Sequence, residues 1–274
     1  MSGFTVKLWG VVGSCAGANQ DIASYGIATP CIEVRVDGHL LVFDSGSGIV
    51  GLGKSLEKLE PLKFHLFITH THWDHIQGFP FFGLIFRPGN QFTVYGLHRE
   101  DTSLEAIFKG LMGYPYFPVG WEAVNADISF QELEPTESVF LSEACQVHTF
   151  PTSHPGGNLA YKVTCHGKSF VYMTDLDHKD TDQEALLAFI DHTDLMIYDA
   201  NFTQSEYEQK RYKGWGHSTW EKAVEFQQKA KVKQLVIFHH GIHRTQVDLQ
   251  ILEEELAKLS DQVVLAKEGM VFSL

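Results

Sequence analysis

The chain has 274 residues, 44% of them hydrophobic, and a formal net charge of −13. A chain of this length can bury one large core or two small ones. The acidic excess opposes binding to long nucleic acids, because phosphate contacts need clustered Lys and Arg, but it is compatible with a small anionic substrate. No hydrophobic run reaches the ~18–20 residues that a membrane span needs, so we expect no membrane insertion.

Hydrophobic runs predict strands along most of the chain. In chain order they are Phe4–Trp9, Cys31–Val36, His39–Phe43, Phe64–Thr69, Phe92–Tyr95, Cys145–Phe150, Leu159–Cys165, Ser169–Met173, Leu195–Tyr198 and Leu235–Phe238. Asp37-Gly38 predicts a tight hairpin, and a turn cluster at 44–48 precedes an expected helix over 49–59. Capping boxes predict helix starts at Thr102, Thr181 and Ser218. We expect a single α/β domain over residues 1–274, with strands and helices in layers.

Four cysteines are spread widely along the chain, at positions 15, 31, 145 and 165, without a C-x-x-C pair. This spacing argues against a disulfide framework and a zinc ribbon, so we expect buried thiols and a cytoplasmic location. The segment 12–15, Val-Gly-Ser-Cys, is faintly similar to a lipoprotein cleavage site. However, Lys7 is the single basic residue before it and residues 5–9 alternate like a strand, which disfavours secretion.

A dense cluster of metal-binding residue types follows the strand predicted at 64–69, in the run His70-Thr-His72-Trp-Asp74-His75. In an extended strand alternate residues share a face, so we expect His70, His72 and Asp74 to converge while His75 begins the next turn. Imidazole nitrogen and carboxylate oxygen together suit zinc, manganese or iron. The run therefore predicts a metal site.

Further candidate ligands follow other predicted strands. His154 lies between a strand and a turn, Asp175 ends a hydrophobic run, and His239 and His240 both follow 235–238. Layered α/β folds gather their sites at strand ends, so we expect these side chains to join the first cluster. Taken alone, each is more often a hydrogen-bonded structural residue. We favour His239 over His240, because it comes directly off the strand.

With these motifs the chain resembles metallo-β-lactamase-fold hydrolases over nearly its full length. The resemblance implies a four-layer αββα sandwich with two divalent metal ions, most often Zn²⁺, with Mn²⁺ or Fe²⁺ as alternatives. It also implies the following roles: His70, His72 and His154 on one metal, Asp74, His75 and His239 on the other, Asp175 bridging them, and Asp44 ordering the ligands. No cysteine stands at a motif position, which disfavours the sulfur-ligated β-lactamases.

Two motifs downstream resemble the ribonuclease Z-like branch. Asp199 stands where those enzymes carry an acid that orients a histidine, and His217 in Gly-His-Ser-Thr matches the histidine that contacts the scissile phosphate. This chain has Asp where ribonuclease Z usually has Glu, so the reach of that contact is open. A purely structural His217 beside a helix cap is the alternative.

The region 97–137 argues against ribonuclease Z itself. It has only Arg99 and Lys109 as Lys or Arg residues against eight acidic residues, whereas an arm that grips tRNA should be basic. The aromatic segment Tyr114–Trp121 could stack a base, cover the site, bury a dimer contact or be a packed Pro-rich loop. We expect the protein to form a homodimer.

We therefore predict a dinuclear metal-dependent phosphodiesterase for a small phosphodiester, with cyclic nucleotides as the leading class. A metal-bridging hydroxide would attack phosphorus, Asp74 and Asp175 would orient it, and His217 with Asp199 would assist the leaving group. One alternative is a thioester or lactone hydrolase, like glyoxalase II or a lactonase, with the same metals. A second is a sensor that retains the metals and binds a nucleotide without turnover.

Overall fold

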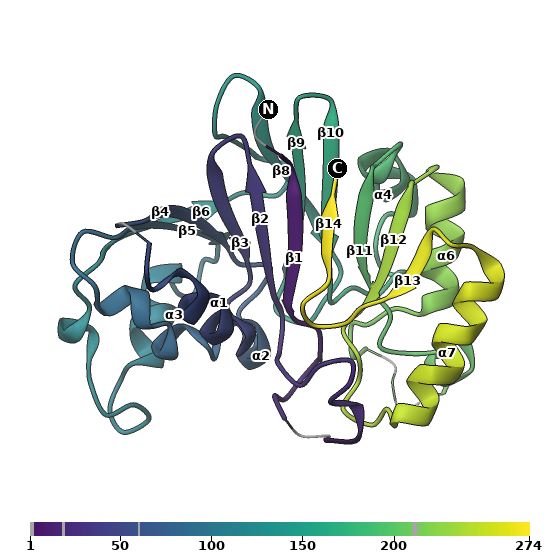
Figure 1. Cartoon of the computed structure of the whole chain (residues 1–274), viewed down its shortest axis with the longest axis horizontal. Coiled ribbons are helices and arrows are strands. Elements are labelled where there is room, and N and C mark those ends of the chain that lie inside the picture. The colour runs from purple at the N-terminus through teal and green to yellow at the C-terminus, as the bar shows by residue number, and fades with distance from the viewer. Residues whose placement is uncertain (1–2, 18–19, 60, 210–211, 213) are drawn as a thin grey trace.

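The computed structural model describes residues 3–17, 20–59, 61–209, 212 and 214–274. Two mixed sheets of seven strands each face one another, and helices cover both outer faces (Figure 1). The first sheet has the order β14 (Val271–Ser273), β1 (Thr5–Gly10), β2 (Cys31–Val36), β3 (His39–Phe43), β4 (Lys63–Phe67), β5 (Gln91–Leu97), β6 (Asp127–Leu133). The second has the order β13 (Val263–Leu265), β12 (Gln234–Phe238), β11 (Leu195–Asp199), β10 (Lys168–Met173), β9 (Asn158–Cys165), β8 (Cys145–Thr152), β7 (Ser138–Phe140).

The helices form the two outer layers, which confirms the predicted four-layer αββα fold. On the outer side of the first sheet lie α1 (Gly48–Leu56), α2 (Trp73–Ile76) and α3 (Leu104–Leu111), and on that of the second lie α4 (Gln183–Ile190), α6 (Trp220–Lys229) and α7 (Gln246–Leu259). Short elements complete the described chain: α5 (Gln204–Tyr207) and the 3-10 turns Gln20–Ile22, Phe79–Phe81, Gly83–Phe86 and Trp121–Ala123. Within the described ranges, no helix combines the length and hydrophobicity needed to cross a membrane.

Aromatic side chains fill the space between the two sheets. Phe43 stacks on Phe67 with ring centroids 5.3 Å apart, and its ring also contacts Tyr161, Phe170 and Tyr172 from the opposite sheet at 5.6–5.9 Å. All five are fully buried. Such rings contribute large apolar areas, so they fix the distance between the sheets on which the site depends.

Most predicted strands are present within one or two residues of their expected bounds, and β2 and β3 match them. Strands β6, β7, β13 and β14 were not predicted. The predicted hairpin is confirmed: Asp37 and Gly38 take positive φ angles of 47° and 79°, as a type I′ turn requires.

The three predicted capping boxes are each displaced by one residue. The observed N-caps are the next residues along, Ser103, Asp182 and Thr219. The reason is that each neighbour also carries a side-chain oxygen and stands one place closer to the first helical residue. The Ser218 hydroxyl instead contacts Tyr198 and His178.

The prediction of four buried thiols is wrong for three cysteines. Cys145 and Cys165 lie directly opposite one another on β8 and β9 and form a disulfide. Cys15 is exposed, and Cys31 alone is a buried free thiol. Strand pairing brings cysteines together whatever their spacing in the sequence, which is why the spacing did not reveal the pair.

Candidate metal centre

The candidate ligands of the first cluster lie in a loop and a short helix rather than on one strand. Strand β4 ends at Phe67, His70 and His72 lie in the loop that follows, and Asp74 and His75 belong to α2. The expected convergence by strand alternation is therefore wrong in its mechanism. The loop and the first turn of α2 bring the four side chains together instead.

The remaining candidates come from the second sheet. His154 follows β8 by two residues, Asp175 follows β10 by two, and His239 comes directly after β12. Asp175 and His239, like Asp44 after β3, take positive φ angles of 53°, 66° and 59°. Left-handed backbone at residues other than glycine is uncommon and concentrates at functional sites. At each of these three positions the left-handed conformation turns the backbone sharply where the strand ends.

These seven side chains form one cluster of nitrogen and oxygen atoms. Three groups have ligand atoms within 4.8 Å of one another: His70 with His72 and His154, Asp74 with His75 and His239, and His70 with His75 and Asp175. Oδ2 of Asp175 lies 3.2 Å from Nε2 of both His75 and His239, and its Oδ1 lies 3.9 Å from Nε2 of His154. Asp175 thus lies between the two histidine groups.

The cluster fits divalent cations. The Nε2 atoms of His70, His75 and His239 are buried and have no hydrogen-bond partner among the described residues. A buried nitrogen without a partner is costly, and a bound metal ion satisfies it. Burial also lowers the pKa of His70, which favours the neutral imidazole that ligates metals.

The two carboxylates carry negative charge into this buried space. Burial alone would raise the pKa of Asp74 and Asp175, but neighbouring His75 and His239 hold both below the ordinary range. Against the effect of burial, the same carboxylates raise the pKa of His75, so its imidazole would release a proton when a cation binds. Ionised carboxylates and imidazoles in their neutral form make up the donor set of a dinuclear metal site.

Asp44 holds several parts of the cluster in place from behind. Its carboxylate accepts hydrogen bonds from Nδ1 of His75 at 2.7 Å, from the Thr69 amide at 2.8 Å and from the Tyr172 hydroxyl at 2.9 Å. Nδ1 of His154 similarly donates to the carbonyl of Gly216 at 2.7 Å. A proton held on Nδ1 leaves Nε2 as the free ligand atom, so these contacts fix both tautomers.

His217 lies beside the cluster and is held by Asp199. Its Nδ1 is 2.9 Å from Oδ2 of Asp199 and 3.6 Å from Oδ1 of Asp175, and its ring stacks on His239 with centroids 5.1 Å apart. The shorter Asp side chain therefore reaches the histidine. Burial lowers the pKa of His217, but the charge and hydrogen bond of Asp199 outweigh it and raise the pKa to about 9. Bound cations would lower it again.

The structure separates His239 from His240. His239 points its Nε2 into the cluster, whereas Nε2 of His240 lies 2.8 Å from the carbonyl of Ala266. Burial lowers the pKa of His240 to about 4, so this imidazole is neutral and donates to that carbonyl.

The N-terminal loop also reaches the site, which the sequence did not reveal. The Ser14 amide donates to Oδ2 of Asp74 at 2.7 Å. A Cβ on Gly13 would stand 2.5 Å from Cε1 of His239, so only glycine fits against this ring. The segment that is faintly similar to a lipoprotein site thus contacts two side chains of the candidate metal centre. A backbone donor and a missing side chain leave little signal in a sequence.

The aromatic segment Tyr114–Trp121 is anchored at its far end. Phe117 contacts Phe81, and Trp121 stacks on Phe79. Tyr114 and Tyr116 are 94% and 83% exposed, so a fully packed loop is not what forms here. Which of the remaining roles they have stays a prediction.

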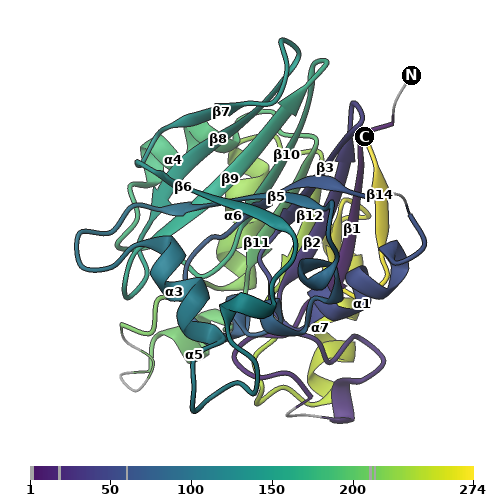
Figure 2. The ribbon, with the colours of Figure 1, turned by 90° about the vertical axis from the view of Figure 1, so that its left-hand side faces the viewer.

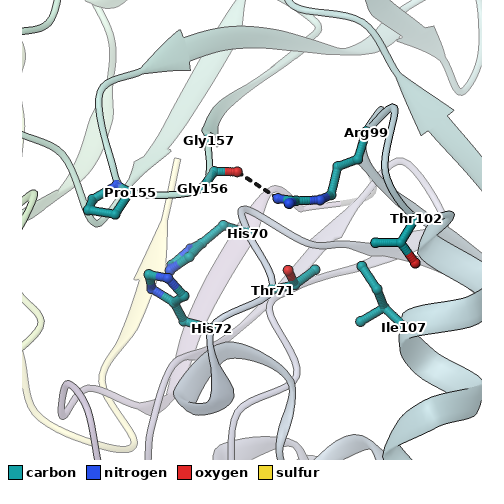
Figure 3. Close-up of a pocket in the computed structure, with 9 residues that line it drawn as sticks. All are labelled: His70, Thr71, His72, Arg99, Thr102, Ile107, Pro155, Gly156 and Gly157. Atoms are coloured by element: carbon teal, nitrogen blue, oxygen red, sulfur yellow. Dashed lines mark hydrogen bonds between the residues drawn. The ribbon is translucent and has the colours of Figure 1, made fainter.

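A cavity of about 340 Å³ opens beside the cluster (Figure 3). His70, Thr71 and His72 form one wall, and the other lining residues come from the loops after β5 and β8 and from α3. The cluster lies at the end of the sandwich that carries α2 and α5, opposite the β9–β10 turn (Figures 1 and 2). Of the seven candidate side chains, His70 and His72 line this cavity, so a molecule in the cavity can contact them.

Known proteins share both the fold and part of the sequence. The family model described as "Beta-lactamase superfamily domain" matches residues 41–240. Ribonuclease Z of Pyrococcus abyssi is 25% identical over 285 aligned residues, which cover 87% of this chain and 88% of that protein. Among solved structures, the metallo-beta-lactamase fold protein YhfI from Bacillus subtilis has a TM-score of 0.74 at 20% identity, with both chains covered completely. A diphosphatase from the PhnP family has a TM-score of 0.70 at 17% identity, covering 99% of this chain and 97% of the other.

Proposed function

The chain belongs to the β-lactamase superfamily, and on that premise we propose that it is a dinuclear metal-dependent phosphodiesterase acting on a small anionic phosphodiester. Cyclic nucleotides are the leading substrate class. The distant relationship to ribonuclease Z supports a phosphodiester, and the net charge of −13 favours a small substrate over a long RNA.

His70, His72 and His154 would hold one metal ion, and Asp74, His75 and His239 the other. The position of Asp175 supports a bridging role, because its two oxygens face different histidine groups. Zinc suits this set of nitrogen and oxygen donors best, with manganese and iron as alternatives. When bound, two such cations supply an activated water and bind the phosphate oxygens.

The protein's own residues would orient the reaction around that centre. The Ser14 amide holds one oxygen of Asp74, and Asp44 holds the imidazole of His75, so both keep a fixed direction before substrate arrives. His217 donates from Nδ1 to Asp199, which leaves Nε2 as the nitrogen that exchanges a proton with the leaving oxygen. Asp199 is fully buried and cannot swing away.

The contact between His217 and Asp199 is the observation that carries the choice of phosphodiester. A metal centre alone suits thioesters and lactones as well. An oriented, protonated histidine beside the metals can donate a proton to the oxygen that leaves phosphorus.

Hydrolysis of bis(p-nitrophenyl) phosphate and of a panel of cyclic nucleotides, with and without zinc, tests the proposal. Replacing His217 by Ala should lower kcat by about 10²- to 10⁴-fold while two metals per chain remain bound. His192→Ala serves as the control, because that side chain is 65% exposed and contacts Asp191 outside the site. Absence of metal-dependent turnover of every ester would overturn the proposal.

Three other results would change the assigned function or the role of His217. Preferential cleavage of S-lactoylglutathione or an acyl-homoserine lactone would indicate a thioester or lactone hydrolase. A nucleotide bound tightly and recovered intact after hours would indicate a sensor. Loss of metal in the His217→Ala variant would make His217 a ligand instead of an acid.

A further inference from the structure

The cavity beside the metal centre extends away from His217. His217, Asp199 and His239 are not among the nine described residues that line it, whereas His70 and His72 are. Its volume of about 340 Å³ lies at the lower end of the ~300–1,000 Å³ that is typical of small-molecule sites. A substrate whose scissile group sits at the metals therefore has room for a further group on this side.

Arg99 faces that space from the loop after β5. Its Nη1 donates to the carbonyl of Gly156 at 2.7 Å (Figure 3). Its Nε and Nη2 donate to the two oxygens of Asp101 at 3.1 Å each. These bonds use three of the five N–H donors of a guanidinium. They hold the group in a fixed direction and leave the second hydrogens of Nη1 and Nη2 available.

The charge at this wall contrasts with the rest of the chain. Among the nine described lining residues, Arg99 is the one Lys or Arg and there is no Asp or Glu. Asp101 is 68% exposed, so solvent screens its attraction and it orients the guanidinium more than it neutralises it. The hydroxyl-bearing residues Thr71 and Thr102 line the same cavity.

We propose that Arg99 forms a second anion subsite, which binds a phosphate group of the substrate other than the one that is hydrolysed. The fork of a guanidinium matches the oxygens of a phosphate and binds them through two parallel hydrogen bonds. The substrate would then be a phosphodiester that carries an additional terminal phosphate. This inference rests on the proposed phosphodiesterase activity for its substrate, but the binding of the second phosphate can be measured without turnover.

Two chromogenic esters test the subsite. They are the p-nitrophenyl ester of thymidine 5′-phosphate and the same ester with an added 3′-phosphate, which share the scissile bond and the leaving group. The wild-type protein should prefer the 3′-phosphorylated ester in kcat/KM by about 10- to 100-fold, the value of a hydrogen bond between charged groups. Arg99→Gln should remove that preference, read as the ratio of the two kcat/KM values within each variant, so that a general change in turnover cancels.

Lys109→Gln provides the matched control. It removes the same charge from α3, where Lys109 pairs with Glu105 outside the cavity lining. This variant should retain the preference, and Arg99→Lys should retain part of it, because it keeps the charge but loses the fork. An equal preference in wild type and Arg99→Gln, or none in wild type, would overturn the subsite.

Failure of the proposed activity gives a different result. If neither ester is cleaved, calorimetric binding of thymidine 3′,5′-bisphosphate and thymidine 5′-phosphate to the zinc-loaded protein decides the question. Tighter binding of the bisphosphate that is lost in Arg99→Gln supports the subsite and refutes only the activity. Equal affinities of the two nucleotides refute the subsite.

Discussion

Replacing Gly13 by Ala should displace one ligand of the metal centre without touching the others. The new Cβ would stand 2.5 Å from Cε1, 2.6 Å from Nδ1 and 3.0 Å from Nε2 of His239. Ordinary carbon contacts lie at ~3.5–4.0 Å, so the imidazole has to move by about 1 Å. It has little room to do so, because its ring is 1% exposed and stacks on His217 and His75 at 5.1 and 5.6 Å.

A shift of this size is large against a zinc–nitrogen bond of ~2.0–2.1 Å. We expect the zinc ion at Asp74, His75 and His239 to bind about 10- to 100-fold more weakly, the loss typical when a ligand loses its orientation. The ion at His70, His72 and His154 should keep its affinity. Turnover of bis(p-nitrophenyl) phosphate should fall about 100-fold, since a 1 Å misplacement costs that much.

The assay is a titration of the metal-free protein with zinc against a competing chelator, with the two affinities fitted separately. Gly83→Ala is the matched control, because a Cβ there meets no heavy atom within 4 Å. A Gly13→Ala protein that folds, binds two zinc ions with wild-type affinity and turns over normally would refute the assigned contact between the loop and His239.

Three further outcomes are expected. Asp44→Asn should weaken zinc binding about 10- to 100-fold, because the His75 imidazole loses its anionic partner. Competition with a chelator measures the zinc affinity, and an unchanged affinity would contradict the role given to Asp44. Tyr172→Phe should lower the free energy of unfolding by about 1–2 kcal/mol in urea titrations and leave kcat nearly unchanged, since a buried hydroxyl to carboxylate bond is lost away from the substrate side. Burial lowers the pKa of His178 to about 4. Between pH 6.5 and 4, His178 therefore binds a proton in the unfolded chain but stays neutral in the folded metal-free protein. The free energy of unfolding should fall by up to about 3 kcal/mol as the pH is lowered over that range. The fall should be smaller in His178→Asn, and equal falls would show that another group titrates.

The sequence predicted the parts of the site that depend on local pattern. His70 to His75 stand together in the chain, and Asp175 and His239 follow hydrophobic runs that predict strands. The structure gathers all of them at one end of the sandwich. The fold followed from the same strand ends together with the family resemblance.

What the sequence did not predict depends on contacts between distant segments. Ser14 acts through its backbone amide, and Gly13 through the absence of a side chain, so neither residue type announces its role. Cys145 and Cys165 needed the register of β8 and β9. In the sequence Arg99 is only a basic residue in an acidic region, and its place at the cavity wall depends on the course of the loop after β5.

The ligands come from both sheets, and this has a consequence for biosynthesis. His70, His72, Asp74 and His75 follow β4 of the first sheet, whereas His154, Asp175 and His239 follow strands of the second. A ribosome-bound chain that has emerged only to residue 200 possesses the first group but lacks His239 and the strand that places it. If Asp74, His75 and His239 hold a metal as proposed, that site would be complete only once residue 239 of the 274 has left the ribosome, and metal uptake there would require the two sheets to have docked.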